Sequence, residues 1–245
     1  MNFDPIGHIE SCYKERFGTP RQPGLVPDSW AILKLRPELN LSDALFGLDG
    51  FSHVWVVFVF HLNTNKGVKT RIHPPRMSGE SIGVFATRSP HRPNPIGLSV
   101  VKIEKIEGNN VYLSGVDFVE GTPVLDIKPY HPQADAISDA KGGWTESRDE
   151  RTVTVSFEPA VEKQLESMGR QGRTSQQLRS IIEKTLELDP RPGFYKGTPE
   201  NPDPYMDAYG FCIEDYNVVY RMDGLVARVT AIEPANQSRK TAPKA

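Results

Sequence analysis

Short apolar segments separated by turn residues dominate the first half of the chain. Residues 53–60 are apolar on both faces and rich in β-branched and aromatic side chains, which predicts a central strand buried on both sides. Residues 98–106 alternate between apolar and polar side chains, and the Gly108-Asn109-Asn110 turn predicts a hairpin with residues 111–119. Further short strands are predicted at residues 3–11, 30–35, 82–86 and 123–127, with one or two helical turns at 42–48. Many short strands with little helix indicate a barrel or closed sheet, although the alternation does not determine the strand order.

The pattern changes in the second half. Residues 132–150 show no periodicity, which predicts a linker or an exposed loop. Thr174 and Gln177 form a capping box at the start of a predicted helix. An apolar stripe at helical spacing follows, made of Leu178, Ile181, Ile182 and Leu186. The remaining predicted elements are a strand at 152–157, a helix at 159–168, a helix end at Asp189-Pro190, and a terminal hairpin from 209–220 and 225–232.

These patterns predict a mainly β protein with two domains. Residues 1–135 form the strand-rich domain, residues 136–150 a linker or exposed loop, and residues 151–235 a smaller α+β domain. Residues 236–245 are polar and basic, which predicts a disordered tail. At 245 residues, with 38% hydrophobic and 24% charged residues, the chain is long enough for one large or two small globular domains.

Charge and cysteine content narrow the functional classes. The net charge of −2 and the pI near 6.3 give no global attraction to nucleic acid, so any basic surface must be local. The longest apolar run, residues 54–60, is too short to span a membrane, and the N-terminus lacks a signal-peptide pattern. Cys12 and Cys212 have neither metal nor redox spacing. We therefore expect a reduced, cytoplasmic protein with no membrane segment.

The most distinctive segment is residues 83–99, with the sequence GVFATRSPHRPNPIGLS. Proline fixes φ and removes a backbone donor, so its three prolines within six residues exclude a helix or a central strand and predict a stiff loop. The loop presents four polar side chains between two predicted strands: Arg88, His91, Arg92 and Asn94. Such a loop is typical of a binding site on a rigid scaffold. The alternative is a proline-rich connection whose charges are simply solvated.

A local basic patch surrounds this loop. Between residues 69 and 92 the sequence has one acidic side chain, Glu80. It has five cations there: Lys69, Arg71, Arg76, Arg88 and Arg92. Such a cluster suits phosphates, and the arginine fork also binds carboxylates. The alternative is that individual arginines cap strands or pair with Asp117, Glu120 or Asp126.

Three smaller features carry candidate chemistry. Asp126 and Lys128 stand two apart, so on a strand they share a face, where they suit a zwitterionic ligand or could orient an amine nucleophile. The alternative is an ordinary surface ion pair.

Gln22-Pro23-Gly24 predicts a type II turn that exposes backbone groups. His61 follows the apolar strand and is a candidate for ligand binding or proton transfer, with a structural role as the alternative.

Several common signatures are missing from the sequence. It contains no GxGxxG, GxxxxGK[ST] or CxxC motif. Its six histidines show neither HxH nor HExxH spacing, so no metal site is predicted. The usual Rossmann and P-loop explanations therefore lack their residues.

Longer motifs occur in one order along the chain. They are PRQPGLV at 20–26, FSHVW at 51–55, FVFH at 58–61, PPR at 74–76, the segment at 83–99, DFVEGTPVLDIKPY at 117–130 and DPRP at 189–192. By these motifs the sequence resembles the TsaA-like family, from about residue 5 to residue 233.

The resemblance implies an S-adenosylmethionine-dependent methyltransferase with a small all-β barrel as its catalytic domain and a smaller α+β C-terminal domain. It also implies a homodimer that binds the cofactor near its interface. The implied substrate is tRNA with N6-threonylcarbamoyladenosine next to the anticodon, methylated on the exocyclic nitrogen. Carried over by position, the expected cofactor contacts are Gln22, Pro23, Gly24, His61, Arg88, Leu98 and the 117–128 segment, with Asp126 and Lys128 in particular.

The chemistry of this reaction adds further expectations. The acceptor nitrogen is urea-like and a poor nucleophile until it loses its proton, so a general base is expected. The candidates, in order of preference, are Asp126, Glu120 and His61. Phosphate, carboxylate and base contacts are expected from Arg71, Arg76, His91, Arg92, Asn94, Arg191, Tyr195 and Lys196.

Two alternatives remain open at this point. One is a non-catalytic RNA-binding module that uses the same basic loop without a cofactor. The other is a methyltransferase of the same fold that acts on another substrate, because a fold does not determine its function.

Overall fold

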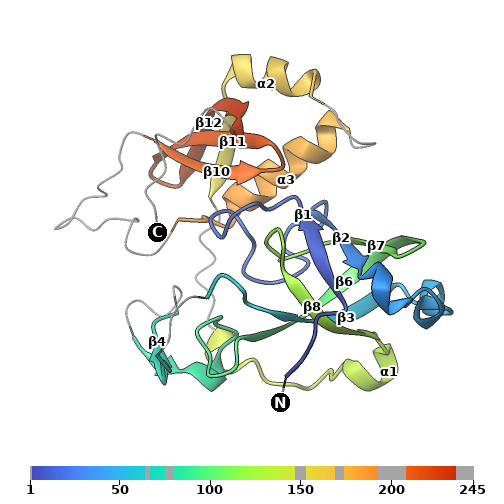
Figure 1. The fold of residues 1–245 in the computed structure, drawn as a ribbon. Helices are drawn as coiled ribbons and strands as arrows, with labels where there is room; N and C mark the ends of the chain where they lie inside the picture. The colour runs from blue at the N-terminus through green and yellow to red at the C-terminus, as the bar shows by residue number, and fades with distance from the viewer. Residues whose placement is uncertain are drawn as a thin grey trace. The chain divides into compact units, whose positions relative to one another are not determined.

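The computed structural model describes residues 2–63, 67–74, 80–146, 153–168, 174–191 and 208–235 (Figure 1). Contacts divide the chain into two compact units. The first unit comprises Met1–Glu10, Ala31–Ser114 and Gly121–Glu150, and the second comprises Ser11–Trp30, Gly115–Glu120 and Arg151–Ala245. Two loops of the predicted first domain, 11–30 and 115–120, thus group with the second unit. The predicted tail at 236–245 lies outside the described residues.

Six strands close into a barrel (Figure 1). In barrel order they are β1 (Gly7–Ser11), β2 (Trp30–Leu35), β7 (Asn110–Ser114), β6 (Ile96–Glu107), β3 (His53–Val59) and β8 (Pro123–Pro129). β3 runs antiparallel to β6 on one side and to β8 on the other. The prediction of a mainly β protein with an all-β barrel is confirmed.

The two faces of β3 have different surroundings. Its inward side chains, Val54, Val56 and Phe58, are buried in the barrel core. Its outward side chains, His53, Trp55, Val57 and Val59, are only half-buried. The prediction that both faces are buried is therefore wrong for the single chain, because a barrel encloses only the inward residues of each strand.

Gly97 of β6 lies opposite Phe58 of β3. A Cβ atom at position 97 would lie 2.6 Å from Cε1 of Phe58, so the ring occupies the space that a side chain would need. The ring also packs edge-on against Phe60, with centroids 5.1 Å apart. Glycine at this position therefore allows an aromatic ring to fill the core beside the distinctive loop.

The strand predicted at 82–86 is shorter than expected. β5 (Ile82–Gly83) pairs with β4 (Arg71–Ile72) and is followed by a 3₁₀ turn, η4 (Val84–Ala86). The carbonyl of Val84 accepts hydrogen bonds from the backbone N–H of Thr87 at 3.1 Å and from its hydroxyl at 2.7 Å, and these bonds turn the chain out of the strand. The other short elements are η1 (Pro37–Leu39), η2 (Asp43–Leu45), η3 (Leu48–Gly50), α1 (Pro132–Asp135) and η5 (Gly143–Thr145).

The second unit contains a four-stranded sheet and two helices (Figure 1). The sheet order is β10 (Tyr209–Ile213), β11 (Tyr216–Asp223), β12 (Val226–Pro234) and β9 (Thr154–Phe157), with β9 parallel to β12. The helices are α2 (Pro159–Glu166) and α3 (Ser175–Glu187). The predicted single strand at 209–220 is wrong, because a turn at Glu214 (φ +52°) splits it into β10 and β11.

The predicted start and buried face of α3 are confirmed. The hydroxyl of Thr174 accepts from the backbone N–H of Gln177 at 3.2 Å, and the Gln177 side chain accepts from the N–H of Thr174 at 3.0 Å. These bonds satisfy two donors that a helix N-terminus otherwise leaves unpaired. The stripe of Leu178, Ile181, Ile182 and Leu186 is buried.

Candidate active site

The distinctive loop, residues 87–95, connects η4 to β6 and is held by its own hydrogen bonds. Nη1 of Arg92 donates to the carbonyl of Thr87 at 2.8 Å, and the N–H of Arg92 donates to the carbonyl of Pro90 at 2.9 Å. The N–H of Ser89 donates to the Thr87 hydroxyl at 3.3 Å, and the N–H of His91 donates to the Ser89 hydroxyl at 3.2 Å. The loop therefore has an internal network in addition to the φ restriction that its prolines impose.

Asn63 fastens this loop to the end of β3. Its Nδ2 donates to the carbonyl of Pro90 at 2.8 Å, and its Oδ1 lies 3.2 Å from Nδ1 of His91. Because an amide oxygen only accepts, Nδ1 of His91 carries the proton in this contact. No sequence motif singles out Asn63, whose one signal is its position two residues after His61 at the end of a strand.

Trp144 makes a second long-range contact with the same region. Its indole N–H donates to the carbonyl of Ala86 at 2.8 Å. The residue lies in the 136–150 segment, where the small and polar composition predicts only a loop or linker. A lone tryptophan in such a segment is the signal that could have marked it, because a partly buried indole usually finds a hydrogen-bond partner.

Asp126 and Lys128 share the outer face of β8, as their spacing predicts. Oδ2 of Asp126 lies 2.7 Å from Nζ of Lys128, and Oδ1 accepts from the N–H of Ile127 at 2.9 Å. The pairing of β8 with β3 shifts here, so that Asp126 faces Val57 whereas Val124 faces the next residue, Phe58. Such bulges redirect side chains and occur frequently beside active sites.

Asp126 and Leu98 flank Val57 in one row across three strands. Val57 pairs with Asp126 of β8 on one side and with Leu98 of β6 on the other. Because neighbouring strands lie about 4.8 Å apart, the two backbones are about 10 Å from each other. The side chain of Leu98 is exposed. The row therefore places an ion pair beside apolar surface, and it unites two of the predicted cofactor residues.

Aromatic side chains continue this outer face. Trp55 is the β3 partner of Lys128, and its ring centroid lies 6.1 Å from that of Tyr130. Nε1 of Trp55 donates to Oδ2 of Asp135 at 3.0 Å, and the N–H of His131 donates to the same oxygen at 2.8 Å. The indole bond, followed by the backbone bond, lowers the pKa of Asp135, because both donors favour its ionised form.

The other predicted site residues of the first unit lie on its surface. His61 follows β3 and is exposed, as are Arg88 and Asn94. Arg71 of β4 is exposed, and its guanidinium is oriented by Ser81, through Nε to the hydroxyl and Nη2 to the carbonyl, both at 2.8 Å. The predicted substrate residues Arg76, Tyr195 and Lys196 lie outside the described residues.

Two groups of predicted site residues belong to the second unit. In the Gln22-Pro23-Gly24 turn, Gly24 has φ +79°, which a type II turn requires at its third position, and its N–H donates to the carbonyl of Gly115 at 2.8 Å. Oε2 of Glu120 accepts from the N–H of Ser11 and from Nζ of Lys14, both at 2.8 Å. These bonds give Glu120 a structural part at the end of β1.

Arg191 is the most deeply buried of the predicted substrate residues that the structure describes. It is 8% exposed, and its Nε and Nη2 donate to the carboxylate of Asp189 at 2.8 and 3.1 Å. Its guanidinium lies 5.5 Å from the ring centroid of Tyr209. This environment supports the local fold, and it makes Arg191 the weakest of the predicted RNA contacts.

Within the described ranges, no set of three or more His, Cys, Asp or Glu side chains converges as metal ligands would. No helix in those ranges is long and apolar enough to cross a membrane.

Both parts of the chain match known families. Residues 8–136 match the model of the tRNA-methyltransferase O N-terminal domain, and residues 150–235 match the model of the TrmO C-terminal domain.

Several relatives cover most of the chain. The tRNA (adenine(37)-N6)-methyltransferase of Escherichia coli K12 is 40% identical over 96% of this chain and 98% of its own. A Pseudomonas aeruginosa protein named putative S-adenosylmethionine-dependent methyltransferase RcsF is 43% identical over 80% of this chain and 84% of its own. The crystal structure of TrmO from P. aeruginosa superposes with a TM-score of 0.72 at 37% identity, over 95% of this chain and 98% of that one.

The motifs indicate the family from the sequence over nearly the whole chain, and the two family models match both of its parts. The closed barrel agrees with the β fold that the resemblance implies. The chain belongs to the TrmO family, within the TsaA-like group.

Proposed function

We propose that this protein is an S-adenosylmethionine-dependent methyltransferase that methylates N6 of threonylcarbamoyladenosine next to the anticodon of tRNA. The observation that carries the proposal is the match to the E. coli tRNA (adenine(37)-N6)-methyltransferase, which covers 96% of this chain and nearly all of the relative. A tRNA substrate also implies a cytoplasmic location.

The outer face of β8 fits the cofactor. The methionine part of S-adenosylmethionine carries an ammonium and a carboxylate, and the adjacent charges of Asp126 and Lys128 are complementary to both. The exposed side chain of Leu98 lies on β6, on the other side of β3 from Asp126, and offers apolar surface for the adenosine part. When bound, the cofactor supplies an electrophilic methyl group.

The chain's own residues must position and deprotonate the acceptor nitrogen. Alignment of the nitrogen with the methyl group accounts for much of the acceleration in a transfer of this kind. Asp126 is our first candidate for the base, because its carboxylate is on the outer face of β8 within the row that contains Leu98. Glu120 and His61 follow, and Glu120 is less suitable because two donors already share its Oε2.

The outer face of β3 also supports a homodimer. Val59, Val57 and Trp55 pair with Ile96, Leu98 and Val100 of β6, and these six side chains form what we call the outer apolar face. None of the six is fully buried in the single chain, and Leu98 is 52% exposed. A contiguous apolar surface of this kind typically binds a partner. A second copy would complete the burial that the two-sided apolar sequence of β3 predicts.

The basic side chains of the first unit suit tRNA. Arg71 presents a guanidinium that Ser81 holds in one orientation, and Lys69, two residues earlier, and Arg88 are also exposed. An arginine fork fits both a phosphate and the carboxylate of the threonyl group. We assign these contacts to Arg71, Arg88 and Arg92 first.

One assay separates the proposal from its alternatives. Purified protein is incubated with S-adenosylmethionine labelled in its methyl group and with tRNA that contains threonylcarbamoyladenosine, and the digested nucleosides are analysed by mass spectrometry. We expect label on that nucleoside, and Arg88→Ala should reduce it. A protein that binds RNA but neither transfers the label nor shows a thermal shift with S-adenosylmethionine would be a binding module. Label on another nucleoside would favour another substrate, and full methylation by both Arg88→Ala and Asp126→Asn would contradict the site.

A further inference from the structure

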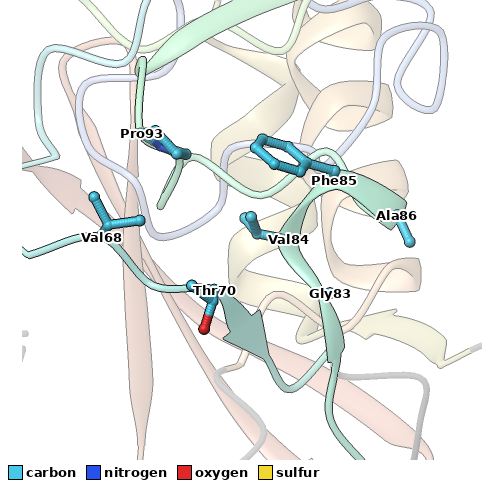
Figure 2. A pocket seen from close by; sticks show the side chains of 7 residues that line it. All are labelled: Val68, Thr70, Gly83, Val84, Phe85, Ala86 and Pro93. Carbon is cyan, nitrogen blue, oxygen red and sulfur yellow. The ribbon is translucent and has the colours of Figure 1, made fainter.

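A small apolar pocket lies between two segments of the first unit, one that carries Lys69 and Arg71 and one that carries Arg88 and Arg92 (Figure 2). Its volume is about 240 Å³, and it is lined by Val68, Thr70, Gly83, Val84, Phe85, Ala86 and Pro93. The two segments are joined by the β4–β5 ladder and by a hydrogen bond from the N–H of Val84 to the carbonyl of Thr70 at 3.0 Å. Backbone pairing therefore builds the pocket, which we call the Phe85 pocket.

The η4 turn holds Phe85 out of the core. Val84 is 2% exposed, whereas Phe85, the next residue, is 78% exposed. The neighbouring carbonyl of Ala86 is bound by the indole of Trp144, which fixes the turn on its other side. Figure 2 shows the ring of Phe85 at the pocket together with Val84 and Pro93. An aromatic ring presented in this way is a ready surface for stacking.

A cation accompanies the ring. The guanidinium carbon of Arg92 lies 5.9 Å from the ring centroid of Phe85, within the range of a cation–π contact. Nη1 of Arg92 is held by the carbonyl of Thr87. Lys69 and Arg71 are exposed on the opposite segment, next to the lining residues Val68 and Thr70. An apolar pocket with an aromatic wall and a cationic rim is complementary to a base attached to a phosphate backbone.

The size and lining of the pocket select its occupant. Pockets for drug-sized ligands measure about 300–1,000 Å³, so this one suits a single ring system better than the whole cofactor. Among its described lining residues, only Thr70 has a polar side chain. The pocket can therefore stack a base but has little to distinguish one base from another. The methylated adenosine needs a general base at its nitrogen, which this lining lacks.

We propose that the Phe85 pocket holds one unpaired nucleobase that flanks the methylated adenosine in the tRNA anticodon loop. The base stacks on Phe85, and Arg92 and Arg71 contact the phosphates on either side of it. This inference rests on the proposed function and adds a second binding point for the same RNA. Because stacking tolerates every base, the pocket contributes affinity and positioning rather than sequence choice.

The test measures binding of the full-length protein to a synthetic anticodon stem-loop that carries threonylcarbamoyladenosine, by fluorescence anisotropy at one salt concentration. Loss of one stacked base contact weakens RNA binding about 5- to 150-fold, so we expect Phe85→Ala to raise Kd within this range. Phe85→Trp should bind within about threefold of the natural protein, because it keeps a stacking face. Phe46→Ala is the matched control, because Phe46 is 95% exposed in the same unit and lies in a segment without cations; its Kd should not change.

Abasic RNAs identify the occupant. With an abasic site at the flanking position that the pocket holds, the Phe85→Ala variant and the natural protein should bind within about twofold of each other. Two RNAs are tested, each with an abasic site on one side of the modified adenosine. If Phe85→Ala weakens binding to both of them as much as it weakens binding to the intact RNA, the proposal is overturned. It is also overturned by a lost thermal shift with S-adenosylmethionine, which would assign the pocket to the cofactor, or by a change from dimer to monomer, which would assign it to a second copy. If the natural protein itself neither binds nor methylates this RNA, the proposed function fails instead.

Discussion

The carboxylate of Asp126 and the ammonium of Lys128 lie 2.7 Å apart on the outer face of β8, beside a bulge that offsets this strand against β3. The same register places Asp126 and Leu98 on the two sides of Val57. An exposed ion pair of this kind contributes little to stability, about 0–1 kcal/mol. Its position beside apolar surface suits ligand binding better than a purely structural role.

Asp126→Asn should lower the rate of methyl transfer about 10²- to 10⁴-fold, the usual contribution of a general base. Steady-state kinetics with modified tRNA measure this effect. Glu107→Gln is the control, because Lys105 and Glu107 form a similarly exposed pair two residues apart on β6, with Nζ and Oε1 2.8 Å apart. Equal losses in the two variants would contradict a role for Asp126 in the reaction.

Leu98→Asp should convert the proposed dimer into monomer, because it places a charge within the outer apolar face. Sedimentation velocity measures the change across a range of protein concentrations. Leu225→Asp serves as the control, because Leu225 is 51% exposed, nearly as much as Leu98, but lies in the turn between β11 and β12 of the second unit. A natural protein that remains monomeric at high concentration would refute the proposed homodimer.

Gly97→Ala should destabilise the barrel by about 1–3 kcal/mol, the typical cost of overpacking a core. The new Cβ would collide with the ring of Phe58, which is buried and packs against Phe60. Urea denaturation measures the free energy of unfolding, and the added substitution Phe58→Leu should reduce the penalty. Gly50→Ala is the control, because nothing lies within 4 Å of a Cβ atom there. Stability unchanged in Gly97→Ala would show that the ring can move.

Cys212 should remain protonated in the folded protein well above neutral pH. Burial first, and then the nearby carboxylate of Glu15, raises the pKa of this thiol to about 11. The folded state therefore keeps a proton that the unfolded chain loses near pH 8.5. The resulting contribution to stability is complete below about pH 8.5 and is lost as the pH rises toward 11.

Alkylation of Cys212 by iodoacetamide, followed by peptide mass spectrometry, measures the titration. The logarithm of the rate should rise with pH through about pH 9.5 without a plateau, because only the thiolate reacts. Glu15→Gln should move the titration to lower pH but leave it above about 8.5, since burial is the larger cause. A plateau below pH 9 in the natural protein would contradict the raised pKa.

Local patterns predicted the local features of this fold. β2 has the bounds predicted from its apolar run, and the capping box at Thr174 marks the start of α3, because both signals depend on residues close in sequence. The turn at Glu214 escaped prediction, since Glu-Asp lacks the glycine or asparagine that usually marks a tight hairpin turn with positive φ. The end of β5 at Gly83 escaped because Val84-Phe85-Ala86 has the composition of a strand.

The candidate site shows the same division. The period of two along a strand predicted that Asp126 and Lys128 share a face, and their ion pair confirms it. The position of Leu98 opposite Val57 depends on strand register, and the bonds of Asn63 and Trp144 join residues 27 to 58 positions apart. No local pattern determines such contacts. The catalytic and binding roles of the site residues remain predictions.

The central claim, methylation of threonylcarbamoyladenosine in tRNA, is tested most directly in cells that lack the gene for this protein. Mass spectrometry of nucleosides from their purified tRNA should show that the N6-methylated form of threonylcarbamoyladenosine has disappeared, while the unmethylated nucleoside persists. A plasmid with the natural gene should restore the methylated form, whereas a plasmid with Asp126→Asn should not. An unchanged level of the methylated nucleoside in the deletion cells would contradict the account.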